Sequence, residues 1–297
     1  MSPADSERRA MTENRDSPQW LLLGGTLFSL VAFAANSIFC RLALKSAAID
    51  PESFTAIRLI GGALFLMLLL RLGNKGEAAG SWRGGLYLFV YAYLFSLAYI
   101  HLDAGVGALI LFGAVQITMF ALGWKNGEKV RPKTAIGMLL AFSGLIILLA
   151  PGGNAPPLLS ALAMTIAGIA WGIYSILGRR SINPLKDTAG NFLRSVPLVV
   201  LAALATLAQG AISITPTGAL YAAASGVLAS GAGYAVWYAV LGKMRAQTAA
   251  TLQLSVPVLA SVAGVVFLGE GLSTRLMIAS VIVLGGIGLA LRGATRQ

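Results

Sequence analysis

The chain has 297 residues, of which 57% are hydrophobic and only 11% are charged, and its mean hydropathy is +0.79. A soluble domain carries roughly 25% charged residues, so this composition excludes a soluble globular protein. The net charge of +11 does not indicate nucleic-acid binding, because the basic residues lie at the ends of apolar runs and form no basic domain. With one cysteine, Cys40, a disulfide framework and a cysteine metal site are excluded.

Ten apolar runs follow one another along the chain, each long enough to cross a bilayer as a helix. They cover residues 20–44, 52–70, 83–102, 104–123, 134–150, 158–178, 189–208, 218–241, 246–268 and 275–291. The connections between them are short and rich in Gly, Pro, Asn and charged residues. The sequence therefore predicts an all-α membrane protein with ten transmembrane helices.

The distribution of basic residues predicts the orientation in the membrane. With the N-terminus inside, 17 Lys and Arg residues fall in inner segments and three in outer segments, while Arg58 and Arg194 lie within spans. Cytoplasmic segments of membrane proteins carry such an excess of basic residues. The first run continues to Leu44, which suits a retained span better than a cleavable signal. We expect both termini to be cytoplasmic and the protein to lie in a bacterial inner membrane.

The two halves of the chain share a sequence pattern. Gly127-Glu128 after the fourth run recurs as Gly269-Glu270 after the ninth, 142 residues later, and Arg58 corresponds to Arg194 at an offset of 136. A unit of five spans is odd, so two copies must have opposite orientations, as in many transporters. The predicted organisation is a cytoplasmic tail (1–19), a first five-helix repeat (20–151), a second five-helix repeat (152–292) and a cytoplasmic tail (293–297).

None of the eleven Asp and Glu residues falls near the middle of a predicted span. An ionisable group at that depth is costly and usually functional, and exchangers of protons for cationic drugs generally need one. The pattern therefore argues against a drug pump and a carboxylate proton relay. His101, the single histidine, lies at the outer end of the third run and is either a polar residue at the interface or a proton sensor.

Arg58 and Arg194 are the most deeply placed charges. Arg58 lies seven residues past Pro51, so roughly 10 Å along its helix at about 1.5 Å per residue. One interpretation is a contact with a substrate carboxylate, or a gate. The other, which the repeat pairing favours, is a snorkelling side chain or a structural helix cap. Glu128 and Glu270 are expected to cap the fifth and tenth helices, where a carboxylate meets the positive end of the helix dipole.

Aromatic and polar side chains mark particular faces of several runs. In the third run, Tyr87, Tyr91, Phe95 and Tyr99 recur every four residues and form one aromatic face. Small and hydroxylated residues also pack membrane helices together, so helix packing is the alternative interpretation of such faces. A proline within a span frees a backbone carbonyl that protein or a cavity must satisfy. The predicted lining of a substrate cavity is Asn36, Tyr91, Tyr99, Trp171, Trp237, Ser255 and Pro257.

The ordered set of these patterns resembles the ten-helix EamA-like branch of the drug/metabolite transporter superfamily. It comprises Trp171-Gly172, Arg194, Thr248–Pro257, Gly269-Glu270 and Ile278–Gly286. The first half departs from the family pattern, with Ala35-Asn36 where the family often has Trp-Gly and Val115 where Pro257 stands in the second half. Within the family, the chain is most similar to exporters of amino acids, including aromatic amino acids.

The resemblance implies a central cavity bounded mainly by helices 1, 3, 4, 6, 8 and 9, with helices 5 and 10 at the periphery. It predicts a secondary transporter, an exporter or facilitator, of small neutral or zwitterionic metabolites that works by alternating access. By similarity, we expect amino acids, including aromatic ones, as substrates. The alternatives are a carrier of sugars, nucleotide derivatives or drugs, a membrane-embedded enzyme, or a scaffold protein. We expect a monomer without catalytic activity, cofactor, metal or nucleic acid, whose partners are a small-molecule substrate and membrane lipid.

Overall fold

The computed structural model describes residues 19–125, 127, 131–152, 155–178, 181–241 and 252–294. Within these residues the chain is helical, apart from loops and one isolated β-bridge between Ile49 and Ile214. The helices of the first half are α2 (Gln19–Lys45), α3 (Pro51–Leu72), α4 (Trp82–Tyr99), α5 (Ala104–Lys125) and α6 (Pro132–Leu149). Those of the second half are α7 (Leu158–Gly178), α8 (Pro184–Ala208), α9 (Pro216–Ala224), the π-helix η1 (Ser225–Ala232), α10 (Gly233–Leu241), α12 (Ser255–Leu268) and α13 (Thr274–Ala294).

Eight helical stretches of the described chain are long and apolar enough to cross a membrane, judged by length and composition. They are α2, α3, α5, α6, α7, α8, the continuous α9–η1–α10 stretch and α13. The 18-residue helix α4, which contains Arg83 and four tyrosines, is not among them, and α12 is described over only 14 residues. The all-α class is confirmed, whereas the count of ten transmembrane helices stays a prediction.

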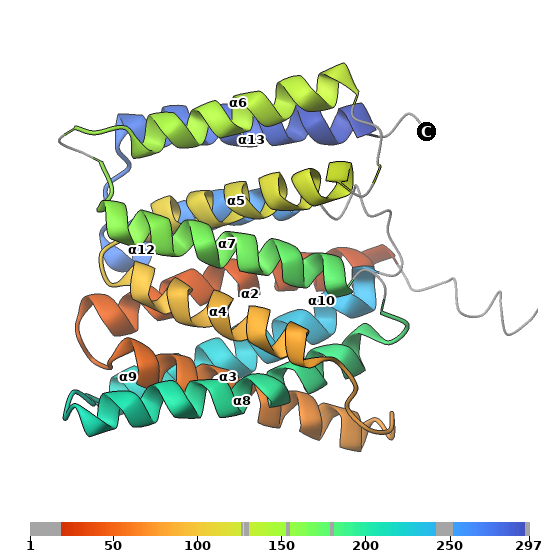
Figure 1. Ribbon diagram of the computed structural model, residues 1–297, viewed down its shortest axis with the longest axis vertical. Helices are drawn as coiled ribbons and strands as arrows, with labels where there is room; N and C mark the ends of the chain where they lie inside the picture. The colour runs from red at the N-terminus through yellow and green to blue at the C-terminus, as the bar shows by residue number, and fades with distance from the viewer. Residues whose placement is uncertain are drawn as a thin grey trace, which may run out of the picture.

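The helices lie side by side in layers (Figure 1). Helices α6 and α13 pack against each other and form one outer layer, at the top of the view. Next to them lie α5 and α12, followed by α7, α2 and α4, and α3 and α8 pack together on the far side. The position of α6 and α13 is the peripheral one expected for the fifth and tenth helices.

Glycines explain how closely α6 and α13 approach. A Cβ on Gly137 would lie 2.5 Å from the carbonyl oxygen of Gly286, and one on Gly286 would lie 2.6 Å from that of Gly137. Without a hydrophobic drive between helices in lipid, such small residues allow close backbone packing. Gly286, in the tenth apolar run, therefore has a packing role.

Contacts between the halves come in matching pairs. Helix α7 packs against α4 and α5, and α2 packs against the α9–α10 stretch and α12. At one end of the bundle, the backbone N–H of Ser213 donates to Asp50 Oδ2 (3.0 Å), and at the other that of Gly80 donates to Asp187 Oδ1 (2.9 Å). When the halves are exchanged, the contacts of α7 correspond to those of α2. In both loop contacts, the connection before the third helix of one half meets the start of the second helix of the other half.

The second helix of each half also begins in the same way. The side chains of Asp50 and Asn183 accept hydrogen bonds from the backbone N–H three residues later and are followed by a proline at the first helical position. Such an N-cap satisfies an N–H that the helix cannot, and proline has no N–H to leave unpaired there. One turn on, the hydroxyls of Thr55 and Thr188 each donate to the carbonyl of that proline at 2.7 Å. These equivalent residues are 133 positions apart.

Candidate functional site

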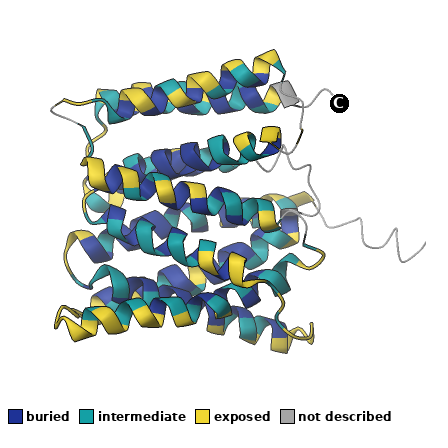
Figure 2. Ribbon diagram, viewed as in Figure 1, coloured by how far each residue is buried: buried dark blue, intermediate teal, exposed yellow. Residues whose placement is uncertain are grey.

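A charged residue lies at the centre of the bundle. Buried residues line the inner faces of the helices, while exposed residues gather at helix ends and outer faces (Figure 2). Among the described residues, the largest fully buried side chain is that of Arg58, which is 1% exposed. It comes from α3, and its partners come from α4 in the same half and from η1 in the other half.

The guanidinium of Arg58 contacts hydroxyls and aromatic rings. Its Nε donates to Ser230 Oγ (3.2 Å) and its Nη2 donates to the hydroxyl of Tyr91 (3.0 Å). Its Cζ lies 5.2 Å from the ring centroid of Tyr91 and 5.0 Å from that of Phe95, within the range of cation–π interactions. Its Nη1 has no hydrogen-bond partner in the described part of the chain.

These contacts exclude the favoured interpretation of Arg58 as a snorkelling or capping residue, because the side chain points into the bundle. Arg194 has different surroundings: it is half-buried, and its Nη1 donates to the carbonyl of Ala79 in the loop before α4 and to that of Gly190 (3.1 Å). Arg194 thus holds a loop, whereas the helix starts make Asn191 the counterpart of Arg58. The offset of 136 paired two arginines by identity and not by position in the fold.

Aromatic side chains from both halves form a continuous ring cluster around this charge. The ring centroid of Tyr91 lies 4.7 Å from that of Trp171. The ring of Trp171 in turn stacks on that of Tyr234, with centroids 5.3 Å apart. Further ring contacts extend the cluster in both directions. Its members are Phe33, Tyr91, Phe95, Tyr99, Trp171, Tyr174, Phe192, Tyr234 and Trp237. Phe33 and Trp171 keep part of their surface accessible, whereas the others are buried.

Four of the predicted lining residues, Tyr91, Tyr99, Trp171 and Trp237, meet in the ring cluster. Asn36 is also buried at the interface of the halves, where its Oδ1 accepts a hydrogen bond from the hydroxyl of Ser225 in η1. The structure therefore brings the four aromatic side chains together from α4, α7 and α10, and it places Asn36 of α2 against η1.

Ser255 and Pro257 lie apart from the ring cluster in the described contacts. The hydroxyl of Ser255 donates to the carbonyl of Leu252 (2.7 Å) and thus serves its own helix. Pro257 falls in the first turn of α12, where N–H groups have no helical acceptor, so it interrupts no helical hydrogen bond there. The neighbouring Thr248 and Thr251 lie outside the described residues.

Sequence reasoning missed the contribution of η1, which supplies Ser225 and Ser230. Single π-helical turns within α-helices occur frequently at functional sites. A Cβ on Gly226 would collide with the backbone carbonyl of Arg58, so only glycine allows η1 to approach α3 this closely. The repeated dipeptides Ser225-Gly226 and Ser230-Gly231, five residues apart, were the available signal.

A second group of charges joins the halves at the end of the bundle predicted to face outward. Arg41 Nε lies 3.1 Å from Glu270 Oε1, and its Nη2 lies 3.2 Å from Asp103 Oδ1. Its Nη1 donates to the carbonyls of Tyr99 (3.0 Å) and Ile100 (2.7 Å). We call Arg41, Asp103 and Glu270 the outer charge network; it links α2, the α4–α5 connection and the α12–α13 connection.

Glu270 acts on a different helix from the one predicted. Its Oε2 accepts a hydrogen bond from the backbone N–H of Ala104 (2.8 Å), the first residue of α5, while Ser273 caps α13 through the N–H of Leu276 (3.1 Å). Burial raises the pKa of the Glu270 carboxyl, although the Ala104 N–H and Arg41 act to lower it. The prediction that Glu270 caps the tenth helix is therefore wrong, and Glu128 lies outside the described residues.

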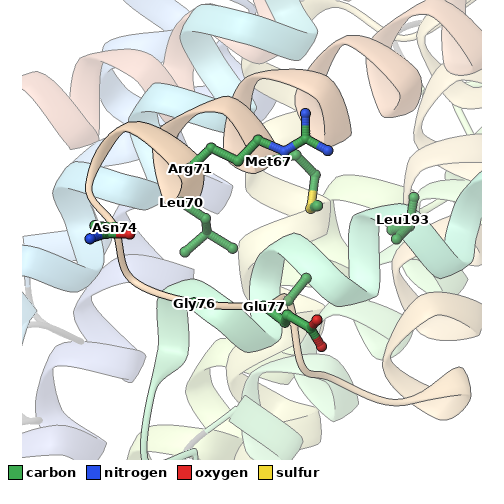
Figure 3. Close-up of a pocket in the computed structure, with 8 residues that line it drawn as sticks. Met67, Leu70, Arg71, Asn74, Gly76, Glu77 and Leu193 are labelled. Atoms are coloured by element: carbon green, nitrogen blue, oxygen red, sulfur yellow. The ribbon is translucent and has the colours of Figure 1, made fainter.

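Two other features lie away from the ring cluster. His101 is exposed at the outer end, and the described residues contain no group of three or more His, Cys, Asp or Glu side chains that could hold a metal ion. A pocket of about 560 Å³ lies at the C-terminal end of α3 (Figure 3). It is lined by Met67, Leu70, Arg71, Asn74, Gly76, Glu77, Ala78 and Leu193, none of which is a predicted site residue.

Comparisons with known proteins agree with a transporter. The EamA-like transporter family matches residues 158–292, which comprise the second half from α7 to α13. An uncharacterized protein of Pseudomonas aeruginosa is 51% identical over 268 residues, covering 90% of this chain and 93% of that protein. The threonine/homoserine exporter RhtA of Escherichia coli is 26% identical over 292 residues, covering 95% of this chain and 93% of the exporter.

Two further similarities concern the substrate class of relatives and the fold. A probable amino-acid metabolite efflux pump of Salmonella typhimurium is 25% identical over 210 residues, covering 66% of this chain and 70% of the pump. A solved crystal structure matches with a TM-score of 0.63 at 21% identity, covering 91% of this chain and 97% of that chain, which shows a shared fold. The family resemblance is thus confirmed: this multi-pass membrane protein belongs to the EamA-like transporter family, within the drug/metabolite transporter superfamily.

Proposed function

We propose that this protein is a secondary transporter, an exporter or facilitator, that carries small neutral or zwitterionic metabolites across the bacterial inner membrane. Amino acids, including aromatic ones, are the proposed substrates. The observation that carries the proposal is the position of Arg58 and the ring cluster, which lie inside the bundle and receive side chains from both halves. The names of the relatives support an amino-acid substrate.

The matching contacts between halves support alternating access by two inverted five-helix repeats. In such transporters the binding site lies where the repeats meet, and movement of one repeat against the other opens each end in turn. Exchange of the halves relates the contacts of α7 to those of α2 and the loop contact at Asp50 to that at Asp187. In this proposal, the outer charge network holds the outer end closed.

Tyr99 offers a physical connection between the outer charge network and the proposed binding site. Its backbone carbonyl accepts a hydrogen bond from Arg41, its ring lies 4.6 Å from that of Phe95, and its hydroxyl donates to the carbonyl of Ala104 (3.2 Å). Separation of Arg41 from its partners therefore removes one of the contacts that fix Tyr99. We propose that outer opening and rearrangement of the ring cluster occur together.

The proposal is tested by counterflow of labelled threonine, homoserine and phenylalanine in proteoliposomes. Trp171→Ala removes the ring that contacts Tyr91, Tyr174 and Tyr234, and we expect at least about a tenfold loss of transport, because misplaced contacts at a site weaken binding. Trp124→Ala is the matched control, because Trp124 is 67% exposed at the end of α5.

Trp171→Phe, which keeps a ring, should fold as the parent does and retain more transport than Trp171→Ala. Thermal unfolding of each purified variant separates a loss of transport from a loss of the folded protein. The proposal fails if the parent transports none of the three amino acids, or if both Trp171 variants transport as the parent does.

A further inference from the structure

We infer that Arg58 binds the carboxylate of the substrate, so that the transported compounds are small carboxylates whose apolar part contacts the ring cluster. This inference rests on the proposed transport function and names the chemical group that the site recognises. On this inference, the site selects its substrates by their carboxylate and not by their amino group.

The first step is the charge balance at Arg58. Arginine keeps its proton at any pH relevant to a protein. Within the described residues, Arg58 has no ion-pair partner, and its hydrogen bonds go to the neutral hydroxyls of Ser230 and Tyr91. A buried charge is unfavourable unless it is paired and hydrogen-bonded. The two ring contacts compensate part of this penalty, but an anion compensates it far better.

The second step is the geometry of the free donor. Ser230 and Tyr91 hold the guanidinium at Nε and Nη2, while the N–H groups of Nη1 have no acceptor in the described part of the chain. The side chain is therefore fixed in place with donors left over. Arginine binds planar carboxylates through such N–H groups, and hydrogen bonds between two charged groups are about twice as strong as those between neutral groups.

The third step places the rest of the ligand. Tyr91 contacts both the guanidinium and Trp171, so a group bound at Arg58 has aromatic surface directly beside it. Trp171 keeps part of its surface accessible and stacks on Tyr174 (5.2 Å) and Tyr234 (5.3 Å). Among the described residues, the hydrogen bonds and ring contacts of this cluster include no carboxylate to hold an ammonium group. An amine without a carboxylate is therefore repelled by Arg58 and gains no ion pair.

The experiment compares ligands that share a phenyl ring and lack either the carboxylate or the amino group of phenylalanine. Purified protein is titrated with phenylalanine, 3-phenylpropanoate, phenylalaninol and phenylalaninamide, and binding is read as a shift in the thermal unfolding midpoint. The same compounds then compete with labelled phenylalanine for counterflow in proteoliposomes. We expect the two carboxylates to bind at least about tenfold more tightly than the alcohol and the amide, since these lack the charged acceptor for Arg58.

Variants of Arg58 provide the second comparison. Arg58→Gln should reduce the preference for carboxylates to less than about twofold, and Arg58→Lys should keep part of it, because the charge remains while the planar donors are lost. Arg71→Gln is the matched control, since Arg71 is exposed in the last turn of the same helix, and this variant should retain the preference for carboxylates. If Arg58→Gln does not fold, the parent's preference among the four ligands decides the question.

The outcomes separate this inference from the proposed function. Equal binding of phenylalaninol and phenylalanine by the parent overturns the inference, even if both are transported. A preference for carboxylates that persists in Arg58→Gln also overturns it and leaves Arg58 a role in stability alone. If carboxylates bind through Arg58 but nothing is transported, the inference stands and the proposed function fails.

Discussion

Replacement of Arg41 by Gln tests whether the outer charge network closes the outer end. The side chains of Arg41 and Glu270 are 7% and 5% exposed and 3.1 Å apart, so Arg41→Gln leaves a buried carboxylate without its cation. The side chain of Asp103 is 46% exposed, so its contact with Arg41 is screened by solvent. The two acidic partners should therefore differ strongly in their contribution to closure.

The expected magnitudes follow from burial. Removal of one partner of a buried ion pair costs about 3–5 kcal/mol, whereas a surface pair contributes about 0–1 kcal/mol. At about 1.4 kcal/mol per factor of ten, Arg41→Gln should raise the open population about 100-fold or more, and Asp103→Asn less than about tenfold. The double variant Arg41→Gln/Glu270→Gln should return toward the parent, because no unpaired buried charge remains in it.

Cys40 provides a native labelling site for the assay, so no cysteine has to be introduced. It is the single cysteine of the chain, is fully buried and is next to Arg41 in α2. The rate at which a maleimide modifies Cys40 in nanodiscs reports the open population when opening and closing are faster than modification. A rate for Arg41→Gln within fivefold of the parent, or a double variant as fast as the single one, would refute the reasoning.

The pH dependence gives an independent check of the same network. Because burial raises the pKa of Glu270, the closed state binds a proton at this carboxyl more tightly than an open, hydrated state does. Lower pH should therefore favour the closed state, and more strongly in Arg41→Gln, which lacks the cation that lowers this pKa. The labelling rate of Arg41→Gln divided by that of the double variant should therefore decrease as the pH is lowered. This ratio cancels the pH dependence of the thiol itself.

Three further predictions concern topology, packing and energetics. A reporter fused after Arg83 should be cytoplasmic and one fused at Pro151 external; a cytoplasmic signal at Pro151 would contradict the inverted repeats. Gly226→Ala should destabilise the protein by about 1–3 kcal/mol through collision with α3, whereas Gly285→Ala, which meets open space, should not; equal unfolding midpoints would contradict this packing. Transport should follow the substrate gradient, with at most weak proton coupling through His101, because no acidic residue lies mid-span; steep proton-driven accumulation in counterflow that persists in His101→Ala would show otherwise.

Local features of the sequence determined much of the fold. Apolar runs and their Gly, Pro and Asn boundaries predicted the membrane-spanning character and the helix start at Pro51, because bilayer thickness and backbone hydrogen bonding act on each helix separately. The predicted run 189–208 missed the first five residues of α8, which begins at Pro184. The four-residue spacing in the third run placed Tyr91 and Tyr99 on one helix face, and both belong to the ring cluster.

The partners of the charged residues were decided only by the tertiary structure. Arg41 is one of the three basic residues in the predicted outer segments, yet it pairs with Glu270, 229 positions away, and Arg58 contacts Ser230, 172 positions away. Hydropathy could not reveal these contacts, because lipid-facing and buried positions of a membrane helix are both apolar, as exposed Leu64 and buried Leu66 of α3 show. Which charge is buried, and beside what, depends on how helices of the two halves meet, and no local pattern in the chain encodes that.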